Sequence, residues 1–177
     1  MDTDRVRIIE EMTTDLLMEY SIDATNGYDI VLLANKMGFA VGNASLADND
    51  DGFIAVDKKQ RTLLGTPSNK VVGVNVKRDY YLKRFIVAHE LGHYVLEGQD
   101  QPLYAHRDTQ PKVRSKAEQE ADYFAACLLM PREAFIRSYE KIRTIEKLSE
   151  RIKILKDTFE APVESIIRRF EELELKV

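Results

Sequence analysis

The sequence predicts an α+β domain in which helices frame a small three-stranded sheet. Hydrophobic residues make up 44% of the 177 residues, which is typical of a globular protein with one core. Charged residues reach 32%, while Gly and Pro contribute only 8 and 5 residues. Few chain breakers and many charges favour helices with solvated faces, and strand-like alternation is confined to residues 39–77.

Two helices are predicted before the sheet. Residues 5–20 carry apolar side chains at helical spacing, opposite charged ones. A shorter helix fits residues 29–37, and Gly38 follows in the position where helices commonly end. The apolar residues of the first helix are Ile8, Ile9, Met12, Leu16 and Leu17.

Three strands are predicted at residues 39–46, 51–57 and 71–77. Each segment is short and is β-branched or alternating. Their boundaries are marked by the turn-forming sequences Asn-Asp-Asp-Gly and Gly-Thr-Pro-Ser-Asn. We expect these strands to pair as an antiparallel sheet.

Helices are predicted again after the sheet. Asp79 is a suitable N-cap for a helix over residues 80–96. Ser115, with Glu118 three residues later, matches a capping box at the start of a helix over residues 115–130.

The end of the chain is predicted to be helical and charged. Pro162 suits the first turn of a last helix. We expect one domain over residues 1–140 and a helical extension, resembling a helix-turn-helix, over residues 141–177 and packed on it. Lys and Arg nearly balance Asp and Glu in this extension, which argues against strong binding of phosphates.

Charge and cysteine content narrow the classes of protein. The net charge of −4 excludes a uniformly basic nucleic-acid surface, so no direct nucleic-acid partner is expected. The single cysteine, Cys127, cannot form an internal disulfide and is expected to be a buried apolar residue. The N-terminus does not resemble a signal peptide, and no apolar stretch is long enough to span a membrane. We therefore expect a cytoplasmic protein without a membrane partner.

The sequence His-Glu-Leu-Gly-His at residues 89–93 is an HExxH motif within the helix predicted after Asp79. His89 and His93 are four residues apart, so they lie on one helix face and can bind the same zinc ion. Glu90 is then placed to act on a metal-bound water. A chance motif or a degenerate site without metal are the alternatives, but both histidines follow the buried stripe of this helix.

A third zinc ligand is expected after the motif, because catalytic zinc sites keep three protein ligands and one open position. The candidates are His106, Glu118, Glu120 and Asp122. Glu120 shares the apolar stripe of its helix with Phe124, so we predict that Glu120 is the ligand. A salt bridge of Glu120 at a helix–helix contact is the alternative, and Glu118 and Asp122 are expected to flank the site or meet solvent.

Two blocks of sequence resemble the ImmA/IrrE metallopeptidases. They are Ile-Val-Ala-His-Glu-Leu-Gly-His-Tyr-Val-Leu at residues 86–96 and Glu-Ala-Asp-Tyr-Phe-Ala-Ala-Cys-Leu-Leu-Met-Pro at residues 120–131. The resemblance implies a zincin-like fold of the gluzincin type, with Glu120 as the third zinc ligand. It also implies peptidase action on helix-turn-helix repressors of phages, mobile elements or stress responses.

The predicted mechanism is hydrolysis of a peptide bond. Zinc lowers the pKa of a bound water toward about 7, and Glu90 accepts the proton as the water attacks. His106, or Tyr104 beside it, is a candidate for stabilising the oxyanion, the alternative for His106 being a plain exposed loop residue. Tyr94 points away from the histidine face and is expected to pack in the core.

The predicted function is that of a zinc endopeptidase that cleaves a helix-turn-helix transcriptional repressor. The strand at residues 71–77 precedes the zinc helix and is a candidate edge for binding an extended substrate, although an ordinary sheet strand is an equal alternative. Two other functions remain open: a zinc-bound antirepressor that sequesters its partner without cleavage, and a DNA-binding regulator that uses the last helices. The presence of Glu90 favours the enzyme, because metal binding alone does not require it.

Overall fold

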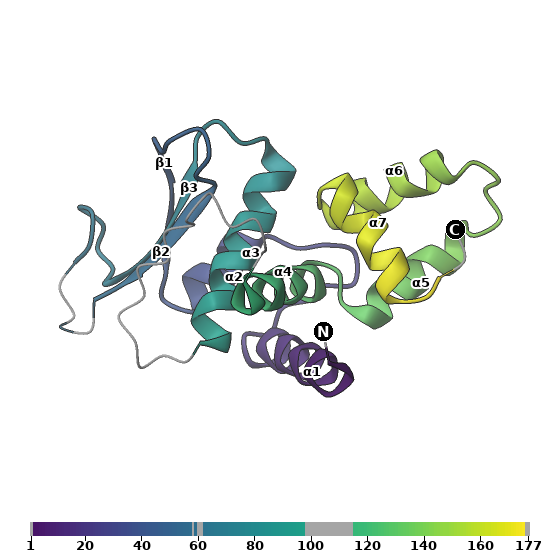
Figure 1. The fold of residues 1–177 in the computed structure, drawn as a ribbon, viewed down its shortest axis with the longest axis horizontal. Coiled ribbons are helices and arrows are strands. Elements are labelled where there is room, and N and C mark those ends of the chain that lie inside the picture. The colour runs from purple at the N-terminus through teal and green to yellow at the C-terminus, as the bar shows by residue number, and fades with distance from the viewer. Residues whose placement is uncertain (1, 58, 60–61, 98–114, 176–177) are drawn as a thin grey trace.

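The computed structural model describes residues 2–57, 59, 62–97 and 115–175, and these residues form the predicted α+β fold (Figure 1). A mixed three-stranded sheet packs against helices, and three further helices gather at the end away from the sheet. None of the helices in the described ranges is long and apolar enough to cross a lipid bilayer. The elements are α1 (Thr3–Glu19), α2 (Ile30–Lys36), β1 (Ala40–Ala44), β2 (Gly52–Val56), β3 (Lys70–Asn75), α3 (Tyr80–Leu96), α4 (Lys116–Leu129), α5 (Arg132–Ile142), α6 (Leu148–Phe159) and α7 (Val163–Glu172).

Side-chain caps fix the starts of three helices. The Asp29 carboxylate accepts a hydrogen bond from the backbone N–H of Val31, and the Asp79 carboxylate accepts one from Leu82. The Ser115 hydroxyl oxygen accepts one from the N–H of Glu118. Each cap satisfies a backbone donor that has no partner within its own helix. The predicted starts of α2, α3 and α4 are therefore confirmed.

The sheet has the order β1-β3-β2, so the last strand in sequence is the central one. β2 pairs antiparallel with β3, but β1 runs parallel to β3, with Ala40 opposite Val71. The expectation of a wholly antiparallel sheet is therefore wrong. β3 is buried along nearly its whole length, as expected for a strand with neighbours on both sides. For the same reason, the prediction that residues 71–77 offer a free edge to a substrate is wrong.

The core lies between the sheet and a stack of helices. α3 packs against β2 and β3, α4 packs against α3, and α1 lies along α4 (Figure 1). α4 is thus buried on two sides, by α3 and by α1. The fully buried side chains at these contacts include Ile54, Val72, Leu91, Phe124 and Leu128.

Gly92, inside the HExxH motif, lets α3 and α4 approach closely. A Cβ atom at this position would lie 3.1 Å from the Phe124 ring and 3.3 Å from the backbone of Ala121. Both distances are shorter than ordinary van der Waals contact, so a larger side chain would force the helices apart. The close approach brings the first turns of α4 beside the two histidines.

The C-terminal helices α5, α6 and α7 share their own aromatic cluster. Phe135 stacks on Phe159 with ring centroids 5.4 Å apart and meets Phe170 edge-on at 5.5 Å. α5 begins at residue 132, and α5–α7 group together in Figure 1. The division of the chain into residues 1–140 and 141–177 stays a prediction.

Arg169 of α7 ties the C-terminal helices to the rest of the molecule. Its side chain is fully buried, and its Nε donates a hydrogen bond to the carbonyl of Met130, at the end of α4. One terminal nitrogen bonds Glu172 at 3.1 Å, and the other lies 3.5 Å from the carboxylate of Glu10 on α1. One buried guanidinium therefore connects α7 with both α4 and α1.

Replacing Arg169 by Ala is expected to lower the free energy of unfolding by about 3–5 kcal/mol, because two carboxylates lose their buried partner. Urea unfolding followed by circular dichroism measures this change. Arg168→Ala is the matched control, since the Arg168 side chain is half exposed, and it is expected to cost less than about 1 kcal/mol. Equal losses in the two variants would contradict a special role for Arg169.

Candidate metal centre

His89 and His93 lie on one buried face of α3, as their spacing predicts. Their exposed fractions are 1% and 4%, and their Nε2 atoms are 3.0 Å apart. Burial of two imidazoles at this separation requires polar partners, because an unsatisfied buried polar group is costly. Those partners are carboxylates on both sides of each ring.

A carboxylate holds the Nδ1 atom of each histidine. His89 Nδ1 lies 2.9 Å from Asp122 of α4, and His93 Nδ1 lies 2.7 Å from Glu97, the residue that ends α3. An ionised carboxylate only accepts hydrogen bonds, so each Nδ1 carries the proton. In the neutral imidazoles, both Nε2 atoms then present lone pairs toward the space between them.

Glu118, in the first turns of α4, completes this cluster. Its two carboxylate oxygens lie 3.2 Å from His93 Nε2 and 3.5 Å from His89 Nε2. Among the residues that the structure describes, His89, His93 and Glu118 form the group suited to a metal ion, with one donor atom from each within 4.8 Å of the others.

The geometry and chemistry of this group fit a tetrahedral metal ion. Ligand atoms about 2.0–2.1 Å from a tetrahedral zinc lie about 3.3 Å from one another. The separations here are 3.0, 3.2 and 3.5 Å. Two nitrogen lone pairs and a carboxylate that converge at this distance repel one another unless a proton or a metal cation lies among them. The three residues therefore fit a metal ion and leave a fourth position for water or substrate.

Electrostatics within the cluster favours positive charge. Burial opposes protonation of His93, but hydrogen bonds to Glu118 and Glu97 and the charge of Glu90 outweigh it and raise the pKa of His93 to about 9. Hydrogen bonds from His89 and His93 hold the pKa of the Glu118 carboxyl well below its usual range. A site with this preference attracts a proton or a metal cation.

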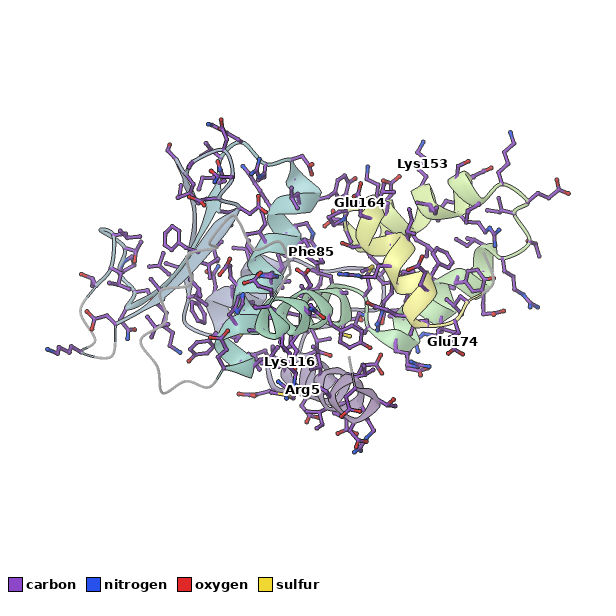
Figure 2. All side chains as sticks on the ribbon, in the orientation of Figure 1. Arg5, Phe85, Lys116, Lys153, Glu164 and Glu174 are labelled. Carbon is purple, nitrogen blue, oxygen red and sulfur yellow. The ribbon has the colours of Figure 1, made fainter. Side chains whose placement is uncertain are left out.

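The predicted ligand Glu120 does not lie at this centre. Its carboxylate accepts a hydrogen bond of 2.7 Å from Arg5 of α1, and Lys116 lies 3.7 Å away. Figure 2 labels Arg5 and Lys116 side by side at this end of α4. Arg5 lowers the pKa of the Glu120 carboxyl through this hydrogen bond. Glu120 therefore makes the salt bridge at a helix–helix contact that the sequence left as the alternative.

The error has a physical cause in the double burial of α4. Glu120 and Tyr123 face α1, where the Tyr123 hydroxyl donates to Glu10 at 3.0 Å. Glu118 and Asp122 face α3, where they meet the two histidines. An apolar stripe predicts burial but not which neighbour covers it. We therefore replace Glu120 by Glu118 as the candidate third ligand.

Asp122, which the sequence expected to flank the site or meet solvent, lies at the site. Its spacing of four residues from Glu118 repeats the spacing of His89 and His93, which was the signal available. Two such pairs on facing helices can meet in register. Asp122 is 3% exposed and positions the His89 ring.

Glu90 lies beside this cluster and is 2% exposed. β2 begins directly against it. A Cβ atom on Gly52 would lie 2.5 Å from Ile86 Cγ2, 2.8 Å from the carbonyl of Gly73 and 3.6 Å from Glu90 Oε1. Only glycine allows the strand this close to the helix, so the sheet closes one side of the site next to Glu90.

The remaining predicted residues have mixed outcomes. Tyr94 packs in the core, with its ring 4.9 Å from that of Phe39 and its hydroxyl accepting a hydrogen bond from Lys70. Cys127 is buried, and burial raises the pKa of its thiol to about 12, as expected for an inert core residue. His106 and Tyr104, the candidates for oxyanion stabilisation, lie outside the described residues.

The fold and this site together define a class of protein. Two histidines of an HExxH helix, a glutamate between them and a carboxylate from the next helix form the arrangement of the HExxH metallopeptidases. The Peptidase M78 family, described as IrrE N-terminal-like domain, matches residues 34–171. The chain belongs to this family, which confirms its resemblance to the ImmA/IrrE metallopeptidases.

A solved structure supports the fold. A transcriptional regulator from Mycobacterium tuberculosis superposes with a TM-score of 0.60 and 19% sequence identity. The match covers 93% of this chain but 46% of that regulator, so this chain spans about half of its length. At this identity, the likeness shows the fold alone. No curated protein shows significant similarity to the chain.

Proposed function

We propose that the chain is a zinc-dependent endopeptidase that cleaves a helix-turn-helix transcriptional repressor in the cytoplasm. One observation carries the catalytic part: a buried glutamate lies beside three donor atoms that converge from two helices. Two imidazole nitrogens and one carboxylate oxygen are a ligand set typical of catalytic zinc. Family membership supports peptidase chemistry.

Each residue of the site has a separate role in the proposed reaction. His89, His93 and Glu118 would hold the zinc, which supplies a polarising charge for the peptide carbonyl and for the attacking water. Glu90 accepts a proton from that water and then delivers it to the leaving nitrogen. Asp122 and Glu97 keep the two imidazole rings in orientation through their Nδ1 atoms.

The proposed substrate rests on the family. Membership of the ImmA/IrrE group is the support for a helix-turn-helix repressor as the protein that is cut. The printed description of the mycobacterial protein, a transcriptional regulator, is in keeping with a role near transcription.

DNA binding through the last helices is less favoured. The adjacent Arg168 and Arg169 are the basic pair of α7, but Arg169 is 0% exposed and is held by Glu172 and Met130. A buried arginine cannot neutralise a phosphate, so the pair does not form a basic surface.

The proposal is tested with a repressor encoded beside the gene. Zinc-loaded protein is incubated with the purified repressor, and intact masses are measured before and after. We expect two fragments whose masses sum to that of the repressor plus one water, and none after removal of zinc with a chelator. An intact repressor in a stable complex would favour the antirepressor alternative, and an intact, unbound repressor would contradict the proposed substrate.

A further inference from the structure

A cleft of about 460 Å³ separates α3 and α4 from the start of α7. Figure 2 labels Phe85 on α3 and Glu164 on α7, which line its two walls. His89 and Glu90 also line this cleft, so it opens onto the proposed catalytic site. The C-terminal helices therefore supply one wall of the space next to the reacting groups.

One side of the cleft carries an apolar patch, formed by Leu82, Phe85 and Ile86 of α3 and Ala126 of α4. The charged residues of the lining are Asp51, Glu90, Asp122, Glu164 and Arg168. Leu82 and Phe85 are partly exposed, whereas Ile86 is 3% exposed. Binding against this apolar patch removes an apolar side chain from water, which is favourable.

Polar residues of the lining link α7 to the catalytic helix. Arg168 of α7 lies 3.8 Å from Asp122, and Asp122 in turn holds His89. Pro162, Glu164 and Ser165 complete the wall on this side. The C-terminal helices are thus connected to the site through the contact between Arg168 and Asp122.

The cleft lies on the Glu90 side of the metal cluster. His89 and Glu90 line it, whereas His93 and Glu118 are not among its lining residues in the described part of the chain. Glu90 delivers the proton to the leaving nitrogen, so the substrate residue that supplies this nitrogen lies next to Glu90. The cleft is the space described beside this position, and its volume leaves room for a side chain there.

We propose that this cleft is a specificity pocket for a large apolar side chain, such as Leu, Met or Phe, on the residue that follows the scissile bond. The start of α7 forms its outer wall, which gives the C-terminal helices a role in choosing the cleavage site. This inference rests on the proposed function, since it requires a peptide to be bound at His89, His93 and Glu118.

Binding of two hydroxamates to the zinc-loaded protein tests the pocket without any cleavage. Acetohydroxamate reports the metal-binding group alone, whereas an isobutylsuccinyl hydroxamate adds a leucine-like side chain. We expect the isobutyl compound to bind about tenfold or more tightly than acetohydroxamate in isothermal titration calorimetry, as burial of a leucine-sized group predicts. Equal affinities for the two compounds would contradict the pocket.

Leu82→Asp is designed to remove this advantage. Leu82 is the third residue of α3, a position where an acidic side chain suits the helix N-terminus, so the variant is expected to fold. The isobutyl compound should lose about tenfold in affinity, while acetohydroxamate should bind as before. Leu32→Asp is the matched control, since Leu32 is 48% exposed and is also the third residue of an Asp-capped helix.

The outcomes separate the two proposals. If acetohydroxamate fails to bind the zinc-loaded protein, the proposed catalytic centre fails and the pocket fails with it. If acetohydroxamate binds but Leu82→Asp and Leu32→Asp have the same affinity for the isobutyl compound, the centre stands and the pocket is wrong.

Discussion

Glu118→Gln is expected to weaken zinc binding by at least roughly 10–100-fold, while Glu120→Gln leaves it nearly unchanged. Loss of a residue that only positions a metal ligand typically weakens the metal affinity by this factor. Glu118 is itself a candidate ligand, because its carboxylate faces both Nε2 atoms. The amide of glutamine keeps the shape of the side chain but removes its negative charge. Competition with a chromophoric zinc chelator measures the affinities, and metal analysis after dialysis gives the stoichiometry.

Glu120→Gln serves as the matched control, because it makes the same change two residues away on the same helix. It weakens only the ion pairs with Arg5 and Lys116, so its cost in stability should stay within about 1 kcal/mol. The apolar stripe alone predicts the reverse ranking, with Glu120→Gln as the severe variant. That ranking, if measured, would show that α4 is rotated relative to the structure described above.

Local signals in the sequence predict the helices well. Asp79 and Ser115 each place a hydrogen-bond acceptor one residue before a periodic segment, and each caps its helix as expected. Asp29 caps α2 in the same way. A cap depends on a few neighbouring residues, so it can be recognised without knowledge of the rest of the fold. The HExxH helix is one of the helices that such a local signal predicts.

Strand order is not a local property, which explains the error in the sheet. The residues Val71, Val72 and Val74 are buried, and this nearly continuous apolar run was the signal for a central strand. Turns and alternation locate strands, but they do not say which strand inserts between the other two. The parallel pairing of β1 with β3 follows from that insertion.

The identity of the third ligand depended on tertiary contacts as well. Both faces of α4 are buried, so hydrophobicity could not distinguish the side that meets α3 from the side that meets α1. The buried Arg169 shows the same limit for charge patterns. Its burial depends on Glu10 and Met130, which lie far from it in the sequence.

Glu90→Gln is expected to keep zinc and the fold but to lower the rate of cleavage by roughly 10²–10⁴-fold. Glutamine is nearly isosteric and leaves the three donor residues in place, so the stoichiometry of zinc should match that of the wild type. It cannot accept a proton from the attacking water, so the chemical step loses its base. Single-turnover cleavage of the repressor and metal analysis of the same sample measure both properties together.

The same variant distinguishes the three functions in cells that carry a reporter under control of the repressor. A peptidase predicts that Glu90→Gln leaves the repressor intact and the reporter silent. An antirepressor predicts that the variant still derepresses, because sequestration needs the surface of the protein and not its base. A DNA-binding regulator predicts wild-type behaviour of Glu90→Gln and loss of function when Ile167, an exposed residue of α7, is changed to Asp. We expect the first outcome, because Glu90 is buried at the position where hydrolysis requires a proton acceptor. A buried carboxylate is costly, and binding of the metal alone does not require one at this position.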